Sequence, residues 1–205
     1  MPYPMSWFWT RTDTAGSDHA LVDDRSGLRA QGVAVAATPV PHTCHYELVT
    51  DDGWTAVRLA VTAEGAGWLR TVRLEHAADR WVVTTSEQGD LNRALADAGQ
   101  PRVGLPGIED QDRLAAAIDL DLGAAPLFNT LPVRRLGLLD AAPGTAHRLT
   151  MAWVLVPSLE VLPNEQVYTV LGERRIRYAS GDFAADLKLD GAGYVIHYPG
   201  LADRC

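Results

Sequence analysis

Residues 44–75, CHYELVTDDGWTAVRLAVTAEGAGWLRTVRLE, decide the fold class of this chain. Apolar and polar residues alternate along the stretch with a period of two, which is the pattern of a half-buried β-strand. Two short clusters rich in glycine and acidic residues, at 51–53 and 64–67, interrupt the alternation where tight turns are expected. The stretch therefore predicts three antiparallel strands joined by short turns.

The same strand pattern continues on both sides of this stretch. It covers residues 7–86 and returns at 147–156, 166–171, 174–179, 183–189 and 194–198. Ten or so strands in one chain favour a large curled sheet. We therefore predict a mainly β protein with a single domain over residues 1–205, built as a curled antiparallel sheet of the β-roll or half-barrel type.

One to three short helices are expected between the two sets of strands. Asp90 has the position of an N-cap for a helix over residues 90–98, and Gly99 lies just beyond its end. Residues 110–117 are a candidate for a second helix, although a strand is expected by Ala117. A helical turn or two is expected after Asn129, with Asn129 or Thr130 as the cap.

The composition excludes several classes of partner. The net charge of -8 argues against a nucleic-acid surface, which needs clustered Lys and Arg. No stretch approaches the roughly 20 apolar residues of a membrane span, so no integral membrane contact is expected. The N-terminus lacks the pattern of a signal peptide, and the two cysteines lie far apart, which predicts a reduced, cytoplasmic protein.

Sequence motifs of enzymes and metal sites are missing. There is no nucleophile elbow, no glycine-rich phosphate loop before a helix and no His-Glu-x-x-His motif. Neighbours on a strand face opposite sides, so Cys44 and His45 form a poor catalytic pair and Cys44 is expected in the core. The spacing of His42 and His45 is a weak match to a zinc site. We predict no cofactor and no metal.

A cluster of charges amid apolar residues is the main candidate site. Asp119 and Asp121 are two residues apart on an expected strand and so face the same side, and Arg134 and Arg135 follow closely. We favour an ion network of these two acids and two bases. The alternative is a hydrolase or isomerase for a sugar-like substrate, with Asp119 and Asp121 as its acid/base pair.

The six tryptophans lie in expected strands and have two interpretations. Large rings usually fill a core, but in a wide curled sheet they can also line a cavity for an apolar or amphipathic ligand. The sequence alone leaves both readings open.

The chain resembles a bacterial glycolipid-binding family first defined as a domain of unknown function. The resemblance rests on the words DLDLG at 119–123, FNTLPVRRL at 128–136, AWV at 152–154, QVY at 166–168 and YPGL at 198–201. It implies a curled antiparallel sheet similar in architecture to the LolA and LolB lipoprotein carriers. It brings no catalytic residues.

We therefore predict a non-enzymatic protein that binds a lipid or glycolipid-like ligand in the concave cavity of its sheet. The acyl portion is expected against Trp, Leu and Val side chains, and polar groups at the rim are expected to hold the head group. The candidate ligand-binding residues are Asp119, Asp121, Asn129, Arg134, Arg135, Trp54, Trp153, Tyr168 and Tyr178. A third possibility is an assembly protein that pairs through a sheet edge.

Overall fold

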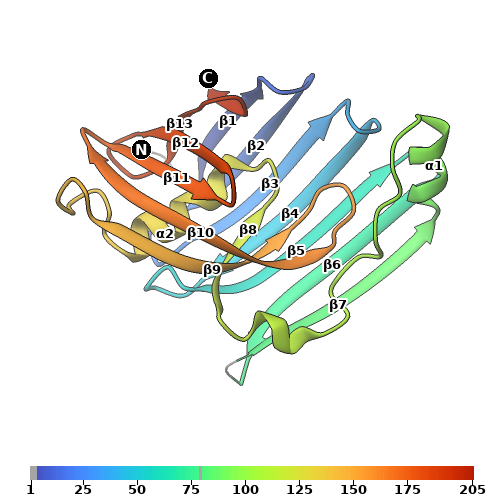
Figure 1. The fold of residues 1–205 in the computed structure, drawn as a ribbon, viewed down its shortest axis with the longest axis horizontal. Coiled ribbons are helices and arrows are strands. Elements are labelled where there is room, and N and C mark those ends of the chain that lie inside the picture. Colours follow the sequence, from blue (N-terminus) through green and yellow to red (C-terminus); the bar gives the residue numbers. More distant parts are fainter. Residues whose placement is uncertain (1–3, 79) are drawn as a thin grey trace.

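The computed structural model describes residues 4–78 and 80–205, which form one open, curled sheet of 14 strands (Figure 1). The strands are β1 (Met5–Arg11), β2 (Gly16–Asp23), β3 (Arg29–Ala36), β4 (His42–Thr50), β5 (Ala56–Gly65), β6 (Trp68–Ala77), β7 (Arg80–Gly89), β8 (Ala117–Leu122), β9 (Ala146–Val154), β10 (Val161–Gly172), β11 (Arg175–Ser180), β12 (Phe183–Leu189), β13 (Val195–Tyr198) and β14 (Ala202–Arg204). The helices are α1 (Leu91–Asp97) and α2 (Thr130–Arg135), with 3-10 turns η1 (Gln111–Leu114) and η2 (Pro126–Asn129).

Two meanders make up the sheet. Strands β1 to β7 follow one another in space, and strands β14 to β8 continue on the other side of β1. The first and last strands therefore join the meanders, with Trp9 opposite Arg204. All pairs are antiparallel except β8 with β9. The predicted mainly β architecture is confirmed.

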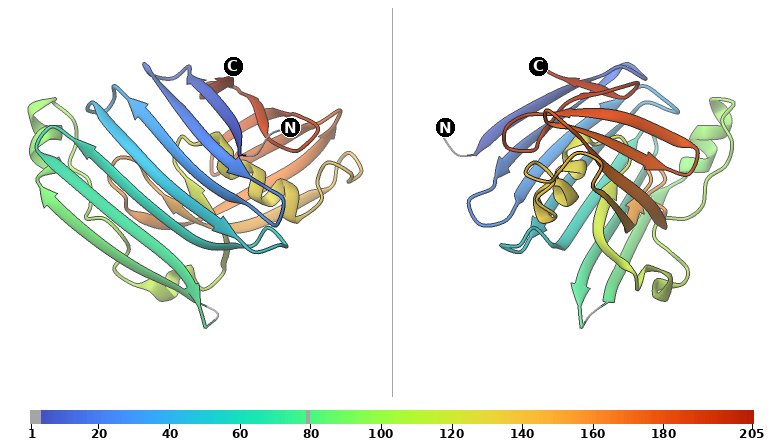
Figure 2. Two further views of the ribbon diagram at one scale, coloured as in Figure 1. Left: turned by 180° about the vertical axis from the view of Figure 1, so that it is seen from behind. Right: turned by 60° about the vertical axis from the view of Figure 1, so that its left-hand side comes forward.

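The sheet curls so that strands β9 to β12 cross in front of the first meander, with α2 and η2 inside the curl (Figures 1 and 2). The sheet is not closed into a barrel, and β7 and β8 are its two edge strands. Part of the β7 edge is covered by Gln111, whose side chain accepts from Val83 N at 3.1 Å and donates to Val83 O at 3.2 Å. Because these bonds occupy the backbone N–H and C=O of Val83, this part of β7 cannot pair with a strand of another chain.

Apolar side chains fill the inside of the curl. Trp9, Leu48, Leu59, Leu74 and Phe128 come from both the sheet and η2, and each is 0% exposed. All five belong to one cluster of buried apolar residues. The expectation of an acyl chain against inner Trp, Leu and Val residues stays a prediction.

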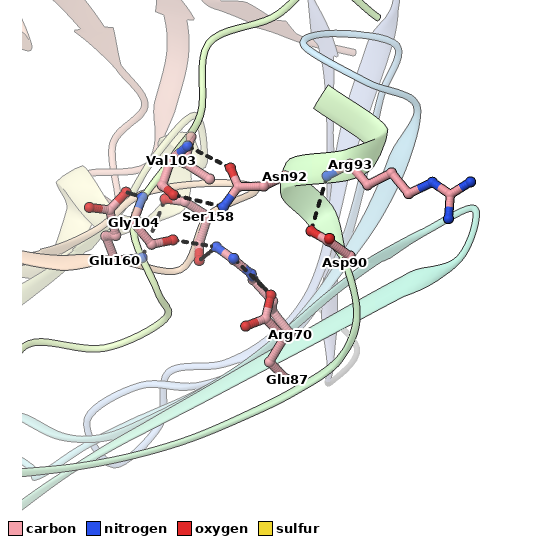
Figure 3. Close-up of polar contacts among 9 residues, drawn as sticks. All are labelled: Arg70, Glu87, Asp90, Asn92, Arg93, Val103, Gly104, Ser158 and Glu160. Atoms are coloured by element: carbon pink, nitrogen blue, oxygen red, sulfur yellow. Dashed lines mark hydrogen bonds and ion pairs between the residues drawn. The ribbon is translucent and has the colours of Figure 1, made fainter. Parts of the chain in front are cut away.

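A buried arginine ties the first meander to the segments that cross the opening (Figure 3). Arg70 on β6 donates from Nη1 to Gly104 O at 2.7 Å and to Ser158 O at 3.0 Å, and from Nε to Glu87 at 2.9 Å. Gly104 lies between α1 and η1, and Ser158 lies between β9 and β10. Arg70 itself is fully buried, so its bonds hold the Gly104 and Ser158 segments against β6.

The helices agree with the sequence in part. The Asp90 side chain accepts from Arg93 N at 3.0 Å and caps α1, as predicted. Residues 110–117 hold the single turn η1 and then enter β8. Trp54 was expected in a strand but precedes β5 with a φ of 69°, in the turn after β4.

Candidate functional site

Six consecutive strands of the second meander place side chains around one pocket of about 250 Å³ at the rim of the curl. Strand register puts Asp121 of β8 opposite Trp153 of β9. Strand β8 also adds Leu122, and strands β10 to β13 add Asn164, Tyr178, Ser180, Phe183 and Tyr198. The turn after β8 and η2 add Gly123, Ala124, Ala125 and Asn129. Leu201 completes the lining.

Three aromatic rings form one wall of this rim pocket. The ring centroids of Tyr178 and Phe183 are 6.1 Å apart, those of Tyr178 and Tyr198 6.1 Å, and those of Phe183 and Tyr198 6.4 Å. Phe183 is 50% exposed, whereas both tyrosines are 8% exposed. The wall therefore runs from the half-exposed ring of Phe183 to the buried rings of Tyr178 and Tyr198.

A chain of hydrogen bonds underlies the pocket. Asn129 Nδ2 donates to Tyr168 Oη at 2.9 Å, and Tyr168 Oη donates to Gln166 at 3.1 Å. Gln166 Nε2 in turn donates to Asp121 Oδ2 at 2.7 Å. Gln166 and Tyr168 are 0% exposed, so the chain fixes the orientation of Asp121 from below.

Asp121 is the only charged residue among the described side chains that line the pocket. Burial raises its pKa to about 6, and the hydrogen bonds from Gln166 and the Leu122 backbone only partly offset this. A carboxylate has roughly four acceptor positions. Two are used by these bonds, so Asp121 keeps the capacity to accept from a ligand.

The match to known proteins covers nearly the whole chain. A family model described as "Putative glycolipid-binding" matches residues 6–204. The chain belongs to this glycolipid-binding family. Its fold is similar to the crystal structure of a DUF1089 family protein from Pseudomonas aeruginosa, at 24% identity, 95% coverage of both chains and a TM-score of 0.70. No functionally curated protein matches the sequence.

The expected ion network of this glycolipid-binding family member is only partly present. Asp119 is fully buried and accepts two bonds from Arg135, from Nε at 3.0 Å and Nη2 at 2.5 Å. Burial raises the pKa of Asp119, and Arg135 works against that rise. Asp121 bonds to Gln166 and does not join this pair. Of the two carboxylates, Asp121 lines the rim pocket and Asp119 does not.

Arg134 turns away from both carboxylates because it meets other partners. Its guanidinium lies 4.3 Å from the centroid of the Trp54 ring, and Nη1 donates to Ala192 O at 2.8 Å. Asp24 lies 3.7 Å from the same nitrogen. Arg134 and Trp54 therefore form a second, separate cluster, and neither lines the rim pocket.

Four of the nine predicted residues meet at the rim pocket: Asp121, Asn129, Trp153 and Tyr178. Tyr168 lies directly beneath them as part of the hydrogen-bond chain. Asn129 is the N-cap residue of α2, as one of the two predicted candidates, but its side chain makes no cap hydrogen bond. Its amide nitrogen donates to Tyr168 instead.

Several pocket residues were not predicted: Asn164, Ser180, Phe183, Tyr198 and the underlying Gln166. Tyr178 and Ser180 have the two-residue spacing that puts side chains on one face, so the period of β11 carried a signal. The sequence carried no such signal for Phe183 and Asn164, because their position at the pocket depends on how neighbouring strands pair. Ser180 Oγ, for example, reaches Asn164 Oδ1 at 3.0 Å across β10 and β11.

Other chemistry finds little support in the described part of the chain. Residues 4–78 and 80–205 hold no group of three metal-ligating side chains, and none of their helices is long and apolar enough to cross a membrane. Cys44 is buried in the core, as predicted, and burial raises the pKa of its thiol to about 12. Both cysteines are free.

A larger hollow of about 710 Å³ lies between α1 and the ends of neighbouring strands. Its lining is largely small or apolar, and its charged residues Asp90, Arg93 and Asp97 are all exposed. Asp90 is already used as the cap of α1. The rim pocket is therefore the better candidate, because its polar groups are held from below and converge on one space.

Proposed function

We propose that this protein binds a glycolipid by seating one sugar ring of the head group in the rim pocket. The observation that carries this proposal is that aromatic faces and hydrogen-bonding side chains border the same space. Sugars present both kinds of surface: axial C–H groups that pack on aromatic rings, and hydroxyls that bond to carboxylate and amide groups. Family membership at the level of glycolipid binding supports the same class of ligand.

The size of the pocket limits what enters it. Pockets for drug-sized ligands measure about 300–1,000 Å³, and this pocket, at about 250 Å³, lies below that range. It suits one sugar ring and not a lipid tail. In the proposed complex, the hydrocarbon chains leave past Phe183 and stay outside the packed core. The likeness to the LolA and LolB carriers and the cytoplasmic location stay predictions.

The test uses octyl glucoside below its micelle concentration, with isothermal titration calorimetry as the readout. Two exposed phenylalanines provide a matched pair: Phe183 at the pocket is 50% exposed, and Phe8 on β1 is 42% exposed. Phe183→Ala removes one stacking face and is expected to weaken binding about fivefold. Phe8→Ala, which removes the same ring outside the pocket, is expected to leave binding unchanged.

A headgroup control separates sugar recognition from general apolar binding. An octyl ether of short polyethylene glycol has the same tail without the sugar, and we expect it not to compete. Equal binding of both amphiphiles, or equal loss in Phe183→Ala and Phe8→Ala, would contradict the proposal.

A further inference from the structure

The charge of the rim pocket points to a narrower class of head group. Its described lining holds one carboxylate, Asp121, and no cationic side chain. The nearby cations are engaged elsewhere: Arg135 binds Asp119, and Arg134 lies over Trp54. A ligand with a phosphate, sulfate or carboxylate on its sugar would therefore meet like charge without compensation.

The aromatic wall adds to this preference. The face of an aromatic ring carries the negative side of the ring quadrupole and attracts a cation within about 6 Å. Tyr178, Phe183 and Tyr198 line the same pocket as Asp121. Trp153 stands opposite Asp121 in the strand register and lines the same space. Carboxylate and rings together describe a site for a positive group.

From this geometry we propose that the sugar seated in the rim pocket is an amino sugar, whose ammonium group binds the Asp121 carboxylate beside the aromatic wall. The proposal rests on the function proposed above and specifies its ligand. The ammonium donates to the acceptor positions of Asp121 that Gln166 and Leu122 leave open. Such charge-assisted bonds are stronger than bonds to a neutral hydroxyl.

The test compares three monosaccharides of similar shape: glucosamine, glucose and glucuronate. Binding is measured by NMR titration of the protein at pH 7. We expect glucosamine to bind about tenfold more tightly than glucose, and glucuronate to bind more weakly than either. Asp121→Asn keeps the shape of the side chain and is expected to bring glucosamine within about twofold of glucose. The control Asp186→Asn removes a carboxylate that binds Arg177 on β11 and is expected to keep the preference.

A pH series provides a second readout that needs no variant. Protonation of Asp121 removes its charge, so glucosamine affinity should fall about fivefold between pH 7 and pH 5, through the Asp121 pKa of about 6. The other titratable groups facing Asp121 are Tyr168, Tyr178 and Tyr198, whose pKa values are raised and which stay neutral throughout. Glucose affinity should stay within about twofold.

The outcomes distinguish this inference from the proposed function. If glucose and glucosamine bind equally well to the wild-type protein, the amino-sugar inference is overturned while sugar binding stands. If glucuronate binds most tightly, the charge argument is overturned. If no sugar produces a shift in the pocket, both proposals fail.

Discussion

Asp18 provides the sharpest test of how this sheet tolerates a buried carboxyl group. The side chain on β2 is 0% exposed, and its main partner is the Tyr46 hydroxyl, which donates to Oδ1 at 3.1 Å. Burial raises the pKa of Asp18 from 3.8 to about 7. The perturbation is Asp18→Asn, which keeps the size of the side chain and cannot ionise.

The magnitude follows from linkage between proton binding and folding. Between pH 3.8 and pH 7 the folded state holds more protons at this site, so the stability it contributes is lost as pH rises. At pH 8.5 the cost of ionised Asp18 is about 4 kcal/mol, because its pKa is raised from 3.8 to about 7 and each pH unit between the two values costs about 1.4 kcal/mol. At pH 5 the same relation gives about 1 to 2 kcal/mol. Asp18→Asn should therefore gain about 3 kcal/mol relative to wild type between pH 5 and pH 8.5.

The assay is urea unfolding of both proteins at the two pH values, followed by tryptophan fluorescence. Asp52→Asn is the control, because this carboxyl lies in the exposed turn between β4 and β5. We expect its difference from wild type to be the same at both pH values. A difference between Asp18→Asn and wild type that does not grow with pH would refute the reasoning.

Further predictions concern other buried contacts and are read by the same unfolding assay. Arg70→Met should lower the free energy of unfolding by about 3 kcal/mol, because it leaves the buried Ser158 carbonyl and the Glu87 carboxylate without their donor; an unchanged value would contradict the role given to Arg70. Gly32→Ala should cost about 2 kcal/mol, because its Cβ would lie 1.9 Å from Tyr46 Cζ, and a neutral result would contradict this close packing. Arg135→Met should cost about 3 kcal/mol at pH 8 and less at pH 5, where Asp119 can protonate; a second change, Asp119→Asn, should recover part of the loss.

The fold could be predicted from the sequence because its signals are local. Alternation in residues 44–75 gave β4, β5 and β6, and the Asp90 cap with Gly99 gave α1. Trp54 was wrongly predicted to lie in a strand, because the alternation of apolar and polar residues does not reveal a positive φ just before a strand begins. The packing of the interior could not be predicted from the sequence either. It depends on which side chains of the two meanders face one another, and that is fixed only when the two meanders pair.

The site was harder to predict because it depends on long-range contacts. Asp119 and Asp121 lie on the same strand and in the same sequence motif. Asp119 accepts from Arg135, whereas Asp121 accepts from Gln166, which is 45 residues away in the chain. The two adjacent arginines predicted an ion network with both carboxylates, but the guanidinium of Arg134 lies over the ring of Trp54. The spacing of residues along a strand predicts the face of the sheet on which a side chain lies. The residue to which that side chain bonds depends on the order of the strands in the sheet.

Sugar binding at the rim pocket is tested most directly by mapping amide chemical shifts during a titration with octyl glucoside. Shifts are predicted to concentrate in residues 121–125, 178–183 and 198–201, which border the pocket. His19, Gly32 and His45 line a separate hollow of about 390 Å³ on strands β2 to β4. Shifts centred on those residues, or no shifts at all, would contradict sugar binding at the rim pocket.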